Sequence, residues 1–149
     1  MNILLTGATG FLGRHIHTAL LQAGHTVLPV ARSLGHDFNR LQTPADWAGL
    51  LSGVDAVINA VGIIGETRNQ RFDVLHTRAP QALIAAAQAA GIGRVVQISA
   101  QGADETAFSA YHLSKRATDD AVRALPQPGW VLRPGLVFGP GGGSQALFM

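Results

Sequence analysis

Three glycines spaced three residues apart, in the stretch TGATGFLG (6–13), constrain this chain more than any other feature. Gly7, Gly10 and Gly13 stand between a short apolar run at 2–6 and a segment whose apolar residues recur at helical spacing. Without side chains here, a strand can turn tightly into a helix that packs close to its sheet. The free N–H groups at the start of that helix can bind a pyrophosphate. Alone, the glycines could mark only a tight turn, but their strand-and-helix context favours a dinucleotide site.

The rest of the chain alternates between strand and helix patterns. Strands are predicted at 2–6, 26–31, 36–38, 55–62 and 94–99 and from 129, and helices at about 12–23, 43–51, 69–90 and 109–125. Pro29 indicates a bulge or a weakly paired position in the second strand, and Pro80 should kink or interrupt the long helix. Near-continuous apolar strands alternating with helices are typical of a parallel sheet covered on both faces. We therefore predict one α/β domain over 1–149, a doubly wound parallel sheet in three layers.

Composition limits what such a domain contacts. Charged residues make up 13% of the chain, about half the average, so a cofactor, missing sequence or a partner such as a second copy of the chain should cover part of the surface. The net charge is only +2 and the arginines are scattered, so no nucleic-acid partner is expected. There is no cysteine, and His15 and His17 would face different ways on a helix, so no metal site is expected. Without a signal-peptide pattern or an apolar run near the ~18 residues of a membrane span, the expected location is the cytoplasm.

The end of the second predicted strand should meet the adenosine ribose of a dinucleotide. An acidic residue there would accept hydrogen bonds from the 2′-OH, whereas an arginine favours a 2′-phosphate. The sequence has Arg32 at this place, nineteen residues after Gly13 and with no carboxylate beside it. This favours NADP(H), with NAD(H) as the alternative, unless Arg32 is only a solvated surface residue. Asp37, next to Phe38, either caps the adenine amino group or is a simple turn residue.

The only tyrosine and the only lysine of the chain, Tyr111 and Lys115, lie four residues apart in YHLSK. Residues at this spacing share one face of a helix. A nearby ammonium favours the ionised phenol, so Tyr111 could exchange a proton while Lys115 lowers its pKa and holds a ribose hydroxyl. Ser99, at the carboxyl edge of a predicted strand, could hold a substrate carbonyl or alcohol. The alternative is a half-buried tyrosine beside a lysine stem, but the chain's general use of arginine favours a specific role for its single lysine.

Together, TGATGFLG, NAVG (59–62), Ser99, YHLSK and LRPGLVFGP (132–140) resemble the short-chain dehydrogenase/reductase superfamily, in its extended or atypical, epimerase-like branch. The resemblance implies a Rossmann fold, an NAD(P) cofactor and a Ser–Tyr–Lys site for hydride transfer at a carbon that bears oxygen. It makes Ser99, Tyr111 and Lys115 the candidate catalytic residues. The candidate cofactor-binding residues are Gly7, Thr9, Gly10, Phe11, Leu12, Gly13, Arg32, Asp37, Phe38, Asn59, Ala60, Val61, Gly62, His76, Lys115, Pro134, Leu136 and Val137.

The sequence departs from the family pattern in two places. Many members carry an asparagine in the helix after the fourth strand, where this chain has His76. That histidine either relays protons or simply lies on a helix face. Members also usually continue past the sixth strand into a substrate-binding part, so this sequence is interpreted as a fragment or an isolated cofactor domain.

A second resemblance points away from turnover. VGIIGET, ISAQGAD and LVFGPGG are similar to the nucleotide-binding accessory subunit of respiratory complex I and its bacterial relatives. The resemblance to that branch implies that the bound nucleotide can stabilise the structure or act as a sensor signal instead of taking part in turnover. Two functions are therefore expected: an NAD(P)(H)-dependent oxidoreductase or epimerase acting on an unidentified small molecule, or a dinucleotide-binding sensor or assembly subunit.

Overall fold

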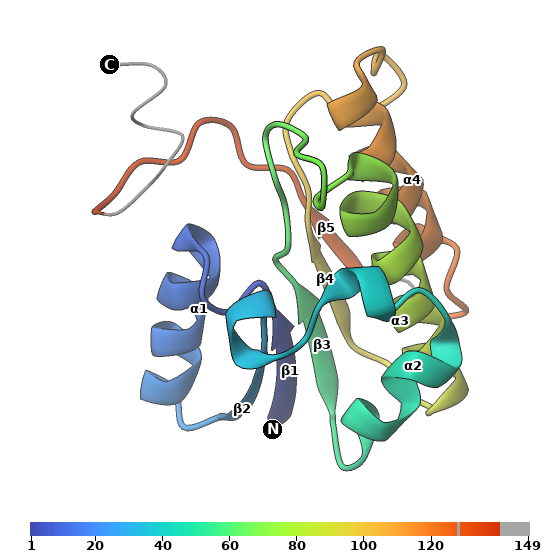
Figure 1. Ribbon diagram of the computed structural model, residues 1–149. Coiled ribbons are helices and arrows are strands. Elements are labelled where there is room, and N and C mark those ends of the chain that lie inside the picture. The colour runs from blue at the N-terminus through green and yellow to red at the C-terminus, as the bar shows by residue number, and fades with distance from the viewer. Residues whose placement is uncertain (128, 141–149) are drawn as a thin grey trace.

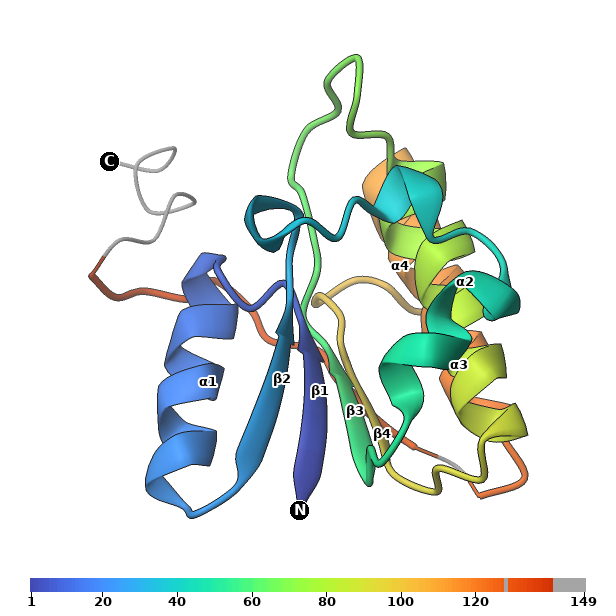
Figure 2. The same cartoon turned by 60° about the horizontal axis from the view of Figure 1, so that its bottom comes forward.

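The computed structural model describes residues 1–127 and 129–140, which form a parallel sheet with helices on both faces. The sheet has the order β2-β1-β3-β4-β5, with the strands β1 (Asn2–Thr6), β2 (Thr26–Val30), β3 (Ala56–Asn59), β4 (Val95–Ile98) and β5 (Trp130–Leu132). The four α-helices are α1 (Phe11–Gln22), α2 (Pro44–Ala48), α3 (Ala79–Ala89) and α4 (Ala110–Arg123). Figures 1 and 2 show α1 on one face and the other three helices on the opposite face. The predicted three-layer, doubly wound α/β fold is confirmed.

The strand order places the first crossover and the later ones on opposite faces of the sheet. From β1 the chain moves outward to β2 over one face, then returns past β1 to β3 over the other face. The order therefore reverses at β1, and open α/β sheets bind ligands outside the carboxyl ends of the strands at this kind of reversal. The main core lies under α2 and α3, where Trp47, Val57 and Leu83 are fully buried.

Two details of the sequence prediction are corrected around β2. Pro29 pairs with Leu5 in an unbroken register, so there is no bulge, and the proline is tolerated because β2 is an edge strand. No strand forms at 36–38, so the described sheet has five strands rather than six. Residues Arg32–Leu34 and Phe38–Arg40 instead form two 3₁₀ turns. The second turn forms because Asp37 Oδ1 accepts hydrogen bonds from the backbone N–H and the side-chain amide of Asn39, both at 3.0 Å.

The long predicted helix is interrupted before Pro80, as expected, but it begins later than residue 69. Thr67 and Gln70 pair with each other through their backbones, which holds the preceding loop out of the helix. A π-helical segment, Asp73–Arg78, then precedes α3. Because Pro80 has no N–H to donate to the carbonyl of His76, that carbonyl accepts a hydrogen bond from Thr118 Oγ1 on α4 instead. The interruption thus ties the π-helical segment to α4.

Candidate functional site

Two neighbouring cavities lie at the carboxyl edge of the sheet. The first, of about 770 Å³, is surrounded by the start of α1 and by the segments that follow β3, β4 and β5. The second, of about 610 Å³, lies between the glycine turn and the segment after β2. Gly10 and residues 60–63 line both cavities, which therefore form one continuous groove across the point where the strand order reverses.

The glycine turn forms the floor of this groove. Gly7 has a φ of +66°, and a Cβ there would lie 2.7 Å from the carbonyl oxygen of Ala60. A Cβ on Gly13 would lie 1.8 Å from the oxygen of Gly7, so both positions require glycine for close backbone packing. Gly10 precedes α1, lines both cavities and has more room, since its Cβ would meet only Gly7 O at 3.3 Å. Phe11 and Leu12 begin α1 and line the first cavity.

The second cavity has a basic and hydroxyl-bearing end. Arg32 and Ser33 line it and are exposed, and the half-buried His36 and Asp37 line it as well. Ser33 Oγ donates a 3.0 Å hydrogen bond to Thr9 Oγ1, which links the glycine turn to the end of β2. Asp37 lines the cavity and also caps the Phe38–Arg40 turn. Of the two roles expected for Asp37, the structure shows the one in the turn. The sequence prediction did not include Ser33 or His36, because only the fold brings the whole loop to the cavity.

Asn59 lies beneath the groove rather than in its lining. Its side chain is buried and bridges two strands: its Oδ1 accepts from Thr6 Oγ1, and its Nδ2 donates to Gln97 Oε1 at 2.7 Å. Thr6 Oγ1 also accepts the backbone N–H of Ala60 at 3.1 Å. Asn59 was predicted to bind cofactor, but its amide groups are used to hold β1, β3 and β4 together. Ala60, Val61 and Gly62, which follow it, do line both cavities.

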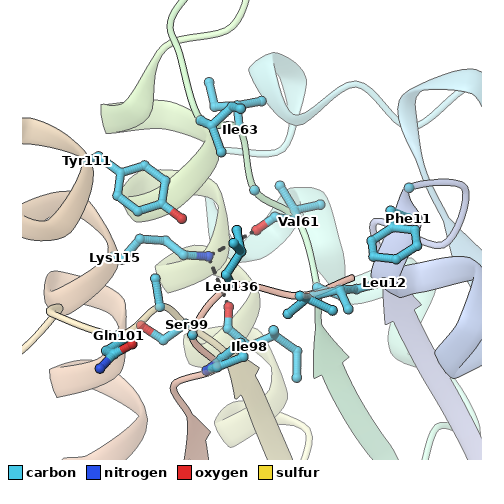
Figure 3. A pocket seen from close by; sticks show the side chains of 18 of the residues that line it. Phe11, Leu12, Val61, Ile63, Ile98, Ser99, Gln101, Tyr111, Lys115 and Leu136 are labelled. Atoms are coloured by element: carbon cyan, nitrogen blue, oxygen red, sulfur yellow. Dashed lines mark hydrogen bonds between the residues drawn. The ribbon is translucent and has the colours of Figure 1, made fainter. Parts of the chain in front are cut away.

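Lys115 projects from α4 to the bottom of the first cavity. Its side chain is only 4% exposed, and its Nζ donates to the carbonyl oxygens of Ile98 at 2.9 Å and Val61 at 3.5 Å. Figure 3 shows these two contacts. Burial lowers the pKa of the ammonium to about 8, although the nearby Asp119 carboxylate opposes this shift. An ammonium has three donors, so one N–H is left for a ligand.

Tyr111 lies on the same face of α4 as Lys115, as the spacing predicted, and its phenol oxygen is turned toward the ammonium (Figure 3). Its ring packs edge-on against Phe72, His76 and His112, with centroids 5.9, 5.5 and 5.1 Å away. These rings partly bury the phenol, and burial raises its pKa above the ordinary value. The expected lowering of this pKa is therefore wrong for the ligand-free protein.

The ionisation of Tyr111 can be measured directly because the chain has no other tyrosine. We expect an ultraviolet difference titration of the ligand-free protein to give a pKa above the ~10 of a free tyrosine, since burial disfavours the phenolate. Phe72→Ala removes one of the covering rings and should shift the pKa back toward that value. A wild-type pKa at or below 10 would contradict the packing described here.

Ser99 lines the same cavity, but its hydroxyl has another partner. Its side chain is buried, and Ser99 Oγ donates a 2.5 Å hydrogen bond to Asp119 Oδ2 on α4. Arg133, just after β5, donates to the same oxygen from Nε at 3.2 Å. The fold thus brings Ser99, Tyr111 and Lys115 to one cavity. Because its proton is committed to Asp119, Ser99 is left to accept a hydrogen bond from a ligand rather than to donate one.

His76 is buried and connects three segments. Its Nε2 accepts the backbone N–H of Ile63 at 3.0 Å, and its Nδ1 lies 2.9 Å from Ser114 Oγ. Ser114 Oγ donates its own proton to the carbonyl of Tyr111, so Nδ1 must carry the proton in the pair with Ser114. Burial, and secondarily the charge of Lys115, lower the pKa of His76 to about 3, which agrees with a neutral ring. With both nitrogens occupied, His76 is a structural link, not the proton relay or the helix-face residue that the sequence left open.

The segment after β5 closes the first cavity on one side. Pro134, Leu136 and Val137 line it, as predicted. Gln101 N donates to Pro134 O at 3.0 Å, and a Cβ on Gly135 would lie 2.9 Å from Gln101 Oε1, so the Gln101 side chain lies over this segment. The sequence analysis missed Gln101 and His112, which also line the cavity. Of the two, His112 carries a sequence signal, because it adjoins Tyr111 on the same helix.

Residues 1–127 and 129–140 offer neither a metal-binding cluster nor a membrane-spanning helix. Those residues contain no cluster of three or more histidine, aspartate or glutamate side chains suited to a metal ion. Within the same residues, no helix combines the length and the apolar character needed to cross a membrane.

Comparison with known proteins gives a family match over almost the whole chain. The model of the NAD dependent epimerase/dehydratase family matches residues 3–148. Ceramide reductase from Caulobacter vibrioides is 36% identical over 93% of this chain and 47% of its own length. NADH dehydrogenase (ubiquinone) 1 alpha subcomplex subunit 9, mitochondrial, from Arabidopsis thaliana is 30% identical over 89% of this chain and 37% of its own length.

The same comparison with solved structures agrees with the fold. MoeE5 in complex with UDP-glucuronic acid and NAD superposes with a TM-score of 0.79, at 25% identity, over 95% of this chain and 57% of that chain. The chain spans about half the length or less of the curated relatives it matches.

Proposed function

The chain belongs to the NAD dependent epimerase/dehydratase family, and on this premise we propose that it is an NADP(H)-binding oxidoreductase or epimerase that acts at a hydroxyl or carbonyl carbon. The observation that carries the proposal is that the glycine turn, Tyr111 and Lys115 lie along one groove. The groove fits a dinucleotide. Gly10 leaves space at the start of α1 for a pyrophosphate, and the third N–H of Lys115 would be available to a ribose hydroxyl.

Each side chain at the inner end of the groove then has a role. The bound nicotinamide would supply or accept the hydride. In the reductive direction the carbonyl carbon receives the hydride, and its oxygen takes the proton of the Tyr111 phenol. The Lys115 ammonium stabilises the resulting phenolate, which regains a proton from water. Ser99, which keeps free lone pairs, accepts a hydrogen bond from the alcohol form of the substrate. Oxidation runs through the same groups in reverse.

The name of the family mentions NAD without a 2′-phosphate. The proposal that this chain prefers NADP(H) over NAD(H) rests on Arg32. Arg32 is exposed at the basic end of the second cavity, and within residues 1–127 and 129–140 it forms no ion pair that would divert it from a 2′-phosphate. Ser33, beside it, adds a hydroxyl at the same end. No carboxylate in the sequence stands beside Arg32 to accept bonds from a 2′-OH.

If Arg32 meets a 2′-phosphate, NADPH should bind at least tenfold more tightly than NADH, because a charge-assisted hydrogen bond is worth ~1.5–3 kcal/mol. Calorimetry on Arg32→Ala should then show that most of this preference is lost. Arg40→Ala is the matched control, since Arg40 is an exposed arginine of the next turn that does not line the cavity. Equal affinities for the two dinucleotides in the wild-type protein would contradict the assignment.

A dinucleotide-binding sensor or assembly subunit is the second candidate function. The observation that favours it is the hydrogen bond from Ser99 to Asp119, which removes the donor that the Ser–Tyr–Lys interpretation assigned to the substrate. The similarity to a mitochondrial NADH dehydrogenase subunit supports it as well. The two functions differ in what they require of Tyr111. Turnover needs its phenol, whereas binding alone does not.

A further inference from the structure

The outer half of the first cavity is apolar. Its wall there contains Ile63 and Ile64, from the loop after β3, and Leu136, from the segment after β5 that is also predicted to contact the cofactor. Ile64 is 58% exposed and Leu136 is 49% exposed, so both side chains present apolar surface to a ligand in this cavity. Figure 3 shows Ile63 and Leu136 near Tyr111, so the apolar wall begins close to the proposed reacting group.

The same cavity offers almost no charge to a ligand. Among the residues that the structure describes, Lys115 is its one lining residue of the Lys, Arg, Asp or Glu type. Its ammonium is buried and already donates to two backbone carbonyls. The other polar side chains of the lining are Ser99, Gln101, Tyr111 and His112. A substrate that carries a diphosphate would need arginine or lysine side chains beside it, and the described wall supplies none for that purpose.

We propose that the substrate is an aliphatic ketone or secondary alcohol, whose alkyl chain leaves the site between Ile63 and Ile64 on one side and Leu136 on the other. The proposal rests on the function proposed above and names its substrate class. The substrate oxygen meets Tyr111, and the Gln101 amide at the rim is placed to hold a second, uncharged polar group near the reacting carbon. The alkyl chain covers the exposed isoleucine and leucine side chains.

The test is a homologous series of alkan-2-ones, from six to twelve carbons, titrated calorimetrically into the chain loaded with oxidised NADP, which cannot reduce them. Each buried methylene should tighten binding roughly fourfold, until the chain end leaves the apolar wall. Ile64→Asp places a carboxylate in that wall and should flatten the dependence on chain length. Leu21→Asp is the matched control because Leu21 is similarly exposed, at 53%, on α1 and does not line the cavity. Unfolding midpoints check that both variants are folded.

UDP-glucose is titrated in parallel, since it represents the charged class of substrate. The proposal predicts that it binds more weakly than the long alkanones. Affinity that does not rise with chain length, an Ile64→Asp variant with the wild-type dependence, or tighter binding of UDP-glucose would each overturn it. If oxidised NADP itself fails to bind, the proposed function is wrong. The alkanone series is then titrated without dinucleotide, and affinity that rises with chain length would still support the apolar site. The two failures are therefore distinguishable.

Discussion

Replacing Tyr111 by phenylalanine should nearly abolish turnover in the complete protein and leave the affinity for NADPH almost unchanged. The substitution removes one oxygen and keeps the ring, which packs against Phe72, His76 and His112. The helix and the pocket should therefore stay as they are, while the proton for the substrate oxygen is lost. A general acid or base typically contributes ~10²–10⁴-fold to a rate, so the loss should be of that order. Steady-state turnover and calorimetry with NADPH measure the two quantities separately.

Lys115→Ala provides the contrast, because the ammonium is assigned to both the phenolate and the ribose. This variant should lose turnover and also bind NADPH more weakly. A Tyr111→Phe protein with undiminished turnover would exclude the phenol from the reaction. The sensor or assembly function would then be the better interpretation.

The fold could be predicted from the sequence because its main signals are local. Alternating apolar runs and helical patterns determine the parallel sheet, and the glycine turn determines how β1 meets α1. The four-residue spacing of Tyr111 and Lys115 places them on one face of α4 without any knowledge of the tertiary structure. Each of these features depends on residues that are close in the sequence, within a single helix, strand or turn.

The corrected predictions concern contacts between distant parts of the chain. Ser99 was expected to hold a substrate carbonyl or alcohol, but its hydroxyl proton is donated to Asp119, twenty residues later, which Arg133 also contacts. His76 was placed on a helix face or in a relay, whereas it joins Ile63 to Ser114 in the interior. Nothing in the local pattern of either residue identifies these partners. The strand expected at 36–38 failed for a local reason, since Asp37 closes a turn there.

Gly10→Val should abolish dinucleotide binding in a protein that still folds. Gly10 is the glycine of the turn at which a side chain is hindered least: its φ is −75°, and its Cβ would meet only the oxygen of Gly7, at 3.3 Å, which needs a shift of a few tenths of an ångström. A valine side chain would extend into the groove, where the pyrophosphate is proposed to lie against the start of α1. Gly49→Val is the matched control, because a Cβ on Gly49 meets nothing within 4 Å and that glycine lies outside both cavities.

Calorimetric titration of NADPH into the wild-type chain and the Gly10→Val variant tests the dinucleotide site most directly. One molecule of NADPH should bind to each wild-type and each Gly49→Val chain, and Gly10→Val should give no binding although circular dichroism shows an intact fold. If the wild-type chain bound no dinucleotide, or a folded Gly10→Val chain bound NADPH with wild-type affinity, the groove at the carboxyl edge of the sheet would not be the site.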